Sequence, residues 1–393
     1  MITARLYRTL TLLAALGANS AGAQTLDLPP MTGSNPGPAS RTTLGGYGDM
    51  HYNLDLESGA AEVDLHRLIL FVGYDFSSAV RFRSELEVEH AVAGDGKPGH
   101  IAVEQAFIDV DLLGEALTLR AGMVLVPMGR INLWHEPPIF NGVERPLVEK
   151  LIIPSTWREG GVGLVGKLSD ALSYQAFLVG GLDASGFSAK SGLRGGRQGM
   201  GEATATGLAL TGRVDYKPLI GARVGVSGYY GLAGPNAELF QLGAGGVEAL
   251  ALDVPVTGLA LDAQWRVGGF ELAALWASFW VGDAASLSAA LDGDGAPLGV
   301  DVASQLQGGY LEVGYDLLDR VESGDQRLIA SLRVERLDTT ADQAGDGRGQ
   351  LREIAGLRYH PHSAVTFKAD LIFSQADDGA SGAGLDLGLG FMF

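Results

Sequence analysis

One short stretch, LWHEPPIFNGVERP (residues 133–146), concentrates the side chains that could do chemistry. The acidic and imidazole groups in and just after it are His135, Glu136, Glu144, Glu149 and Glu159. Imidazoles and carboxylates together bind divalent metals. The helical zinc pattern HExxH is missing, because Pro137 and Pro138 follow Glu136 directly and proline opposes a helix interior. With no second histidine nearby, we expect neither a metal nor another cofactor.

A hydrolytic site is the second chemistry that these residue types suggest. It would need a Ser or Thr nucleophile, a His base and an orienting partner. The chain has 7 His but no Gly-x-Ser-x-Gly elbow. His360 and His362 flank Pro361, which is typical of a turn. We therefore expect that the protein is not an enzyme.

The N-terminal residues predict export. Residues 1–23 combine basic Arg5 and Arg8, a short apolar core and the small residues around Ala23, which is the pattern of a signal peptide cleaved after Ala23. Residues 24–43 predict a flexible leader. Losing two arginines changes the net charge from −18 to −20, which argues against nucleic acid as a partner. The chain has no Cys, and after the signal it has no apolar run long enough for a membrane-spanning helix.

From residue 44 onward the hydrophobic period is two, the period of a β-strand. In VRFRSELEVE (residues 80–89), apolar residues alternate with charged residues, so one face is apolar and the other is wet. The pattern predicts sixteen strands, over residues 44–56, 64–75, 79–91, 102–112, 116–126, 159–168, 171–182, 206–217, 221–231, 254–267, 269–282, 307–317, 326–337, 350–360, 363–375 and 383–393. We therefore expect an all-β protein.

Short turns and long loops alternate along the chain, which places the long loops on one side of the sheet and is typical of a transmembrane β-barrel. A soluble β-sandwich would also show period two. Aromatic residues near strand ends and the alternating apolar C-terminus favour the barrel, with Leu389, Phe391 and Phe393 as the expected recognition signal for barrel assembly. Closure pairs every backbone group in lipid, and sixteen antiparallel strands enclose an aqueous channel. Residues 44–393 are thus the predicted barrel.

The sequence resembles Gram-negative outer-membrane porins, in particular the phosphate-selective porin O and P family. The stretches that carry the resemblance are residues 119–166, 333–339 and 356–371, together with terminal Phe393. The first of them, LRAGMVLVPMGRINLWHEPPIFNGVERPLVEKLIIPSTWREGGVGLVG, is the most specific. The resemblance implies passive diffusion of small hydrophilic solutes, a bacterial outer-membrane location and a homotrimer. It also implies that residues 127–158 fold inward as a constriction loop.

The expected channel residues follow from the loop and from alternation. The constriction loop offers Arg130, His135, Glu136, Glu144, Arg145, Glu149, Lys150 and Arg158. The pore wall offers Arg81, Arg83, Glu85, Glu87, Arg120, Arg213, Arg223, Arg266, Arg333 and Lys368. Because wall charges of both signs occur, a general pore and an anion-selective, phosphate-type pore both fit. A third hypothesis is a structural or adhesive barrel plugged by its loop. The loop glutamates are expected to pair with wall residues such as Arg81, Arg83 or Arg120, and the other partners are membrane lipid and the barrel assembly machinery.

Overall fold

The computed structural model describes residues 41–393, apart from residues 206, 235–238, 244–245, 251, 291–296, 298, 322–323 and 344–347. The predicted signal peptide and nearly all of the predicted leader lie outside the described residues.

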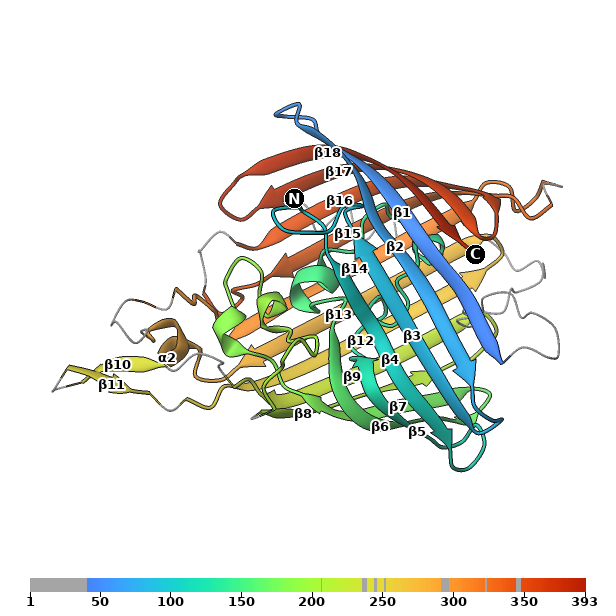
Figure 1. Cartoon of the computed structure of the whole chain (residues 1–393). Coiled ribbons are helices and arrows are strands. Elements are labelled where there is room, and N and C mark those ends of the chain that lie inside the picture. Colours follow the sequence, from blue (N-terminus) through green and yellow to red (C-terminus); the bar gives the residue numbers. More distant parts are fainter. Residues whose placement is uncertain are drawn as a thin grey trace.

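Sixteen antiparallel strands form a closed barrel, which confirms the predicted fold class and excludes the sandwich (Figure 1). Each strand pairs with its neighbour in the chain, except that β9 pairs with β12 across a long connection. The barrel strands are β1 (Thr42–Asp55), β2 (Ala61–Asp75), β3 (Val80–Glu89), β4 (Ile101–Asp111), β5 (Thr118–Leu125), β6 (Arg158–Ser169), β7 (Leu172–Gly180), β8 (Leu208–Tyr216), β9 (Ala222–Leu232), β12 (Pro255–Val267), β13 (Phe270–Val281), β14 (Gln305–Asp316), β15 (Arg327–Asp338), β16 (Gln350–His362), β17 (Val365–Ala376) and β18 (Ser381–Met392).

The first and last strands close the barrel. β1 pairs with β18 in a register that sets Tyr47 opposite Met392. Beyond β18, the backbone N–H groups of Gly46 and Phe393 each donate to the other residue's carbonyl, at 2.9 Å. A side chain at Gly46 would meet the Ile69 carbonyl oxygen at 2.3 Å, so only glycine fits at this crossing.

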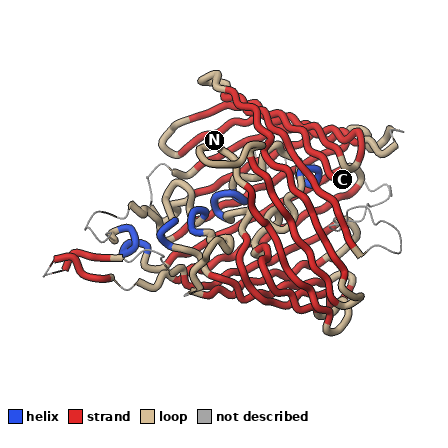
Figure 2. The backbone as a smooth tube through the Cα atoms, viewed as in Figure 1, coloured by secondary structure: helices blue, strands red, loops and turns tan. Residues whose placement is uncertain are grey.

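The remaining elements are short and lie in the connections. They are a two-stranded hairpin, β10 (Phe240–Gly243) and β11 (Gly246–Ala249), the 3-10 turns η2 (Pro137–Ile139), η4 (Ala184–Gly186) and η5 (Arg194–Gly196), the π-helical turn η3 (Val148–Ile152) and α2 (Ala284–Ser288). The hairpin was not predicted. Figure 2 shows long loops and most helical turns gathered toward the end of the barrel from which this hairpin projects. In the described part of the chain, no helix is long and apolar enough to cross a membrane.

The two faces of the barrel wall have opposite polarity. In β17, Phe367, Leu371 and Phe373 are exposed on the outer face, whereas Lys368 and Asp370 are buried on the inner face. Exposed Leu, Val, Tyr and Trp side chains recur on the other strands. This arrangement is the reverse of a water-soluble barrel, in which apolar side chains fill the interior.

Candidate functional site

Residues 126–157 connect β5 to β6 and are hereafter the 126–157 segment. It is one residue shifted from the predicted loop, because Arg158 already pairs with Leu125 as the first residue of β6. All residues of the segment except exposed Lys150 are buried or half-buried, although only η2 and η3 within it are regular. Pro137 and Pro138 begin η2, where a missing N–H costs no helical hydrogen bond.

Inward-facing side chains of distant strands donate to the backbone of the segment. Arg67 of β2 donates to the His135 carbonyl at 2.8 Å. Arg213 of β8 donates to the Gly129 carbonyl at 2.8 Å, and Lys368 of β17 donates to the Gly142 carbonyl at 2.7 Å. The segment therefore contacts the inner face of strands that are widely separated around the barrel.

The segment also donates to the wall. The Val143 N–H donates to the Asp370 carboxylate at 2.6 Å. The Leu147 N–H donates to Glu335 at 2.8 Å, and the Asn141 amide donates to Glu312 at 2.8 Å. These bonds replace the strand partners that an irregular backbone lacks, so burying this segment leaves few polar groups unpaired.

Glu149 accepts hydrogen bonds both from the segment and from the barrel wall. Its carboxylate accepts from the backbone N–H groups of Arg130 and Ile131 and from the Tyr310 hydroxyl, the last at 2.7 Å. Burial raises the pKa of Glu149, and the Arg130 guanidinium opposes that rise. Glu149 and Arg130 are buried together, so this geometry assigns both to anchoring the segment.

Asn132 joins the two ends of the segment. Its amide nitrogen donates to the carbonyls of Val126 at 2.7 Å and Trp157 at 3.0 Å, and its amide oxygen accepts from the Trp157 N–H at 2.8 Å. Neither Asn132 nor Trp157 was singled out from the sequence. Neither residue belongs to a repeating sequence pattern, so the sequence carried no signal for this pair.

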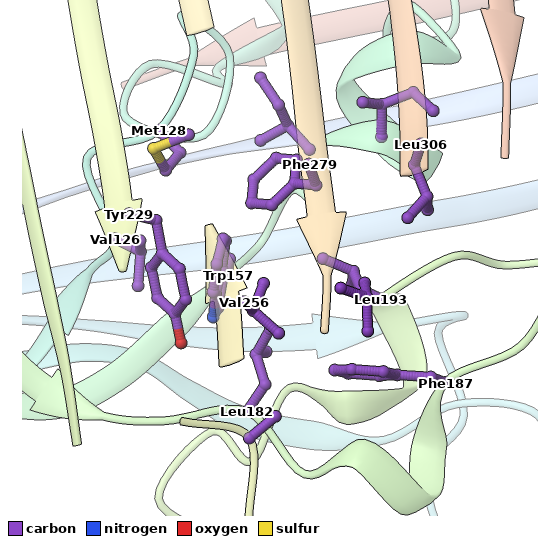
Figure 3. Close-up of a cluster of buried hydrophobic side chains, with 14 of the residues drawn as sticks. Val126, Met128, Trp157, Leu182, Phe187, Leu193, Tyr229, Val256, Phe279 and Leu306 are labelled. Atoms are coloured by element: carbon purple, nitrogen blue, oxygen red, sulfur yellow. The ribbon is translucent and has the colours of Figure 1, made fainter. Parts of the chain in front are cut away.

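An apolar cluster fixes the same end of the segment against the wall (Figure 3). The Trp157 ring lies 4.8 Å from Tyr229 and 6.3 Å from Phe279, measured between ring centroids. Val126 and Met128 belong to the same cluster and are fully buried. The larger buried apolar cluster thus joins this end of the segment to the wall and to neighbouring connections.

On the side of β1 and β2, a cavity of about 60 Å³ separates the segment from the wall. Its charged lining consists of Asp49, Glu89 and Glu144 together with Arg67, Arg145, Lys150 and Arg194. Lys150 is the exposed residue of η3. Within the described part of the chain, no ion pair engages the side chain of Arg145 or Lys150. By contrast, Arg67 of the same lining pairs with Asp49, and Arg194 donates to the Ser155 carbonyl.

Glu144 and His135 anchor to the wall through ionic hydrogen bonds. Glu144 lies 2.9 Å from His51 Nδ1, and although burial disfavours its charge, this bond lowers the pKa of Glu144 to about 2. His135 Nε2 lies 3.2 Å from Glu104, and although burial disfavours the imidazolium, Glu104 raises the pKa of His135 to about 9. Glu136 is also enclosed, and burial raises its pKa.

The expected pairing between loop glutamates and three wall arginines is wrong. Each arginine instead pairs with an aspartate on an adjacent strand, because that neighbour is closer than the loop. The pairs are Arg81 with Asp111, Arg83 with Asp75 and Arg120 with Asp109.

The other predicted wall residues also lie on the inner face, most of them with partners. Arg213 pairs with Asp262, Arg266 with Glu271, and Arg333 with Glu312; Arg223 lies 3.8 Å above the Trp134 ring; and Glu85 accepts from Gln105 while Glu87 is buried. A wall in which most basic groups are neutralised differs from a continuous basic ladder.

Comparisons with known proteins extend the sequence and fold findings. No family model matches the sequence. Solved structures with the same fold include the anion-selective porin from Comamonas acidovorans (TM-score 0.56, 12% identity, 90% of this chain and 99% of that chain). They also include the outer membrane channel DcaP of Acinetobacter baumannii (TM-score 0.56, 12% identity, 92% and 100%). Salmonella typhi OmpF, solved with daunomycin, is a third (TM-score 0.57, 14% identity, 90% and 97%).

One relative is close enough in sequence to define a family. It is an uncharacterized protein of Aquifex aeolicus (strain VF5), which is 34% identical over 346 residues. The match covers 84% of this chain and 75% of that protein. The chain therefore belongs to the same family as this Aquifex protein, and it has the barrel fold of outer-membrane porins.

Proposed function

We propose that the protein is an outer-membrane porin that lets small hydrophilic solutes diffuse passively through the barrel. The observation that carries the proposal is the polarity of the closed wall, with apolar side chains exposed outside and charged side chains inside. A lipid-facing apolar band and a polar interior are the properties of membrane-spanning barrels. The shared fold with outer-membrane porins supports this reading, and no enzymatic step is proposed.

The 126–157 segment is the proposed constriction. Its hydrogen bonds to β2, β8, β14, β15 and β17 support a position across the lumen. Since the apolar cluster fills the side near Tyr229 and Phe279, the proposed path runs past the cavity beside β1 and β2. The charges of that cavity would then meet the solute.

Anion preference is the second candidate, and one observation favours it. Arg145 and Lys150 line the cavity without an ion pair to any described residue, so their charge is available to a passing anion. The anion-selective porin of Comamonas acidovorans has the same fold. Phosphate selectivity of the porin O and P type has less support, because carboxylates neutralise most wall arginines.

The proposed partners are membrane lipid, the barrel assembly machinery and two further copies of the chain. A structure of Vibrio cholerae OmpT with the same fold is described as a trimer form. Leu389, Phe391 and Phe393 remain the proposed assembly signal.

Planar-bilayer recording in asymmetric KCl tests these proposals. A porin gives steady ohmic steps, whereas a plugged structural barrel gives no steady current. If Lys150 borders the path, Lys150→Glu shifts the reversal potential toward cations. The matched control is Lys167→Glu, an equal charge change at an exposed residue paired with Glu115, away from the cavity. Equal shifts of the reversal potential in both variants would show that Lys150 does not border the path.

A further inference from the structure

Histidine and carboxylate side chains gather on the inner face of β1–β3, beside the proposed path. His51 and His66 stack with ring centroids 4.6 Å apart, and His66 meets His90 edge-on at 5.8 Å. The sequence gave no reason to group them, because they come from β1, β2 and the end of β3. The β-sheet register brings them together: Arg67 is opposite both Asp49 and Glu89.

From this cluster, we propose that Asp64, His66 and His90 form a binding site for a divalent transition-metal ion such as Zn²⁺ or Ni²⁺. Asp64 Oδ2 lies 2.7 Å from His90 Nδ1 and 3.5 Å from His66 Nδ1. One ligand atom from each of the three lies within 4.8 Å of the others. Zinc bonds to nitrogen and oxygen of about 2.0–2.2 Å set tetrahedral ligand atoms roughly 3.3 Å apart, and the two Asp64 distances lie on either side of this value.

The donor set determines which ions the site takes. Two imidazole nitrogens and one carboxylate suit Zn²⁺, Ni²⁺, Co²⁺ and Cu²⁺, whereas Mg²⁺ and Ca²⁺ prefer oxygen ligands alone. Three protein ligands leave a fourth position for water, as in open zinc sites. The ion is therefore expected to exchange with the solution and not to be locked in the fold.

The three proposed ligand residues can be reached from solution. The side chains of Asp64, His66 and His90 keep 16%, 29% and 33% of their surface exposed. His66 and Glu89 also line the 60 Å³ cavity, so an ion entering there reaches an imidazole ligand directly. His90 has φ of 54°, a left-handed conformation that is uncommon for a residue with a side chain. Its backbone N–H donates to the His66 carbonyl, which ties the two ligand residues together.

Two other groups of possible ligands were weighed. Glu85, Glu104 and His135 are completely buried, and Glu87, Glu89 and His100 supply one imidazole only. The first lacks an open path for exchange, and the second is less selective for transition metals. Both serve as internal comparisons in the experiment.

The test is isothermal titration calorimetry of the folded full barrel in detergent, without a histidine tag, with NiCl₂ and ZnCl₂ titrated in separate experiments. The buffer contains about 10 mM MgCl₂, so that Mg²⁺ occupies sites made of oxygen ligands alone. The wild type is expected to bind about one transition-metal ion per chain. The double variant His66→Ala/His90→Ala is expected to lose this binding. Asp64→Asn, which keeps the shape of the side chain, is expected to weaken it by about tenfold or more.

The matched control is His362→Ala, at an exposed histidine at the end of β16, and it is expected to bind as the wild type does. The gel shift of unboiled samples verifies that each variant is folded. Absence of binding by the wild type, or binding that survives in the double variant and is lost in His135→Ala or His100→Ala, overturns the assignment. Because titration does not require conduction, a silent bilayer recording would count against the proposed function alone.

Discussion

At the scale of single residues, buried charged groups decide how the segment is held. Glu149 satisfies two backbone N–H groups and one hydroxyl at once. A buried donor left without an acceptor costs about 1–3 kcal/mol, more than an average hydrogen bond contributes. The value of Glu149 therefore lies in the donors that its removal would leave unpaired.

Glu149→Ala is expected to lower the free energy of unfolding by about 3 kcal/mol or more, since it leaves two backbone N–H groups and the Tyr310 hydroxyl without their acceptor. Denaturant unfolding followed by tryptophan fluorescence measures the loss. The neighbouring substitution Lys150→Ala, at an exposed side chain, is the control and should change stability by about 0.5 kcal/mol or less. Similar losses in both variants would contradict the anchoring role.

His135 should make stability depend on pH. Burial lowers the pKa of His135, but the Glu104 carboxylate outweighs burial. The pKa is therefore raised from about 6.5 in the unfolded chain to about 9 in the fold. A raised pKa adds stability that is complete below pH 6.5 and is lost as the pH rises through 9. The unfolding free energy of wild type should thus fall between pH 6 and pH 9.5 more than that of His135→Gln. Parallel pH curves for the two proteins would refute this.

At the scale of elements, the strands and the segment obey different rules. A strand is specified by local alternation, which is why all sixteen were predictable to within a few residues. The segment is specified by contacts with strands far away in sequence, such as Val143 with Asp370. Its place between β5 and β6 was predictable, but its partners were not.

The wrong predictions about side-chain partners also arise because these partners lie on different elements of the fold. Arg81, Arg83 and Arg120 were expected to reach the loop, but adjacent-strand aspartates are nearer. Glu104, which anchors His135, lies in an ordinary strand and carries no local signal. The metal ligands His66 and His90 likewise became neighbours only through the sheet register.

Trp157→Ala tests the apolar attachment of the segment. Removing a fully buried Trp is expected to cost about 3–5 kcal/mol. The barrel strands should persist, because their hydrogen bonds are independent of this cluster, so far-UV circular dichroism should retain a β-sheet spectrum while the unfolding midpoint falls. Trp280→Ala, at a side chain 40% exposed on the outer face, is the control and should cost less. A larger cost for Trp280 would show that the inner cluster contributes little.

At the scale of the whole molecule, closure joins the two ends of the described chain. The β1–β18 ladder ends in the reciprocal hydrogen bonds of Gly46 and Phe393. The proposed assembly signal lies in this seam, because Leu389 is opposite Met50, Phe391 is opposite Gly48 and Phe393 closes the ladder.

Two changes at Phe393 separate these roles. Phe393→Leu keeps the backbone hydrogen bonds, so refolding into detergent should match the wild type, while assembly in cells should fall. Deletion of Phe393 removes a pair of closing bonds and should lower the folded fraction in detergent as well. Gel mobility of unboiled samples measures folding in both settings. Normal assembly of Phe393→Leu in cells would show that the aromatic side chain of Phe393 is not part of the assembly signal.

The pairing of Tyr47 with Met392 has a consequence for how the chain is made. No intermediate length of the chain can form this ladder, so an incomplete product exposes two unpaired strand edges. Such edges are templates for aggregation, and contacts between residues so distant in sequence form slowly. An export intermediate is therefore most vulnerable to proteases and to self-association until β18 pairs with β1, even if the strands between them have already paired.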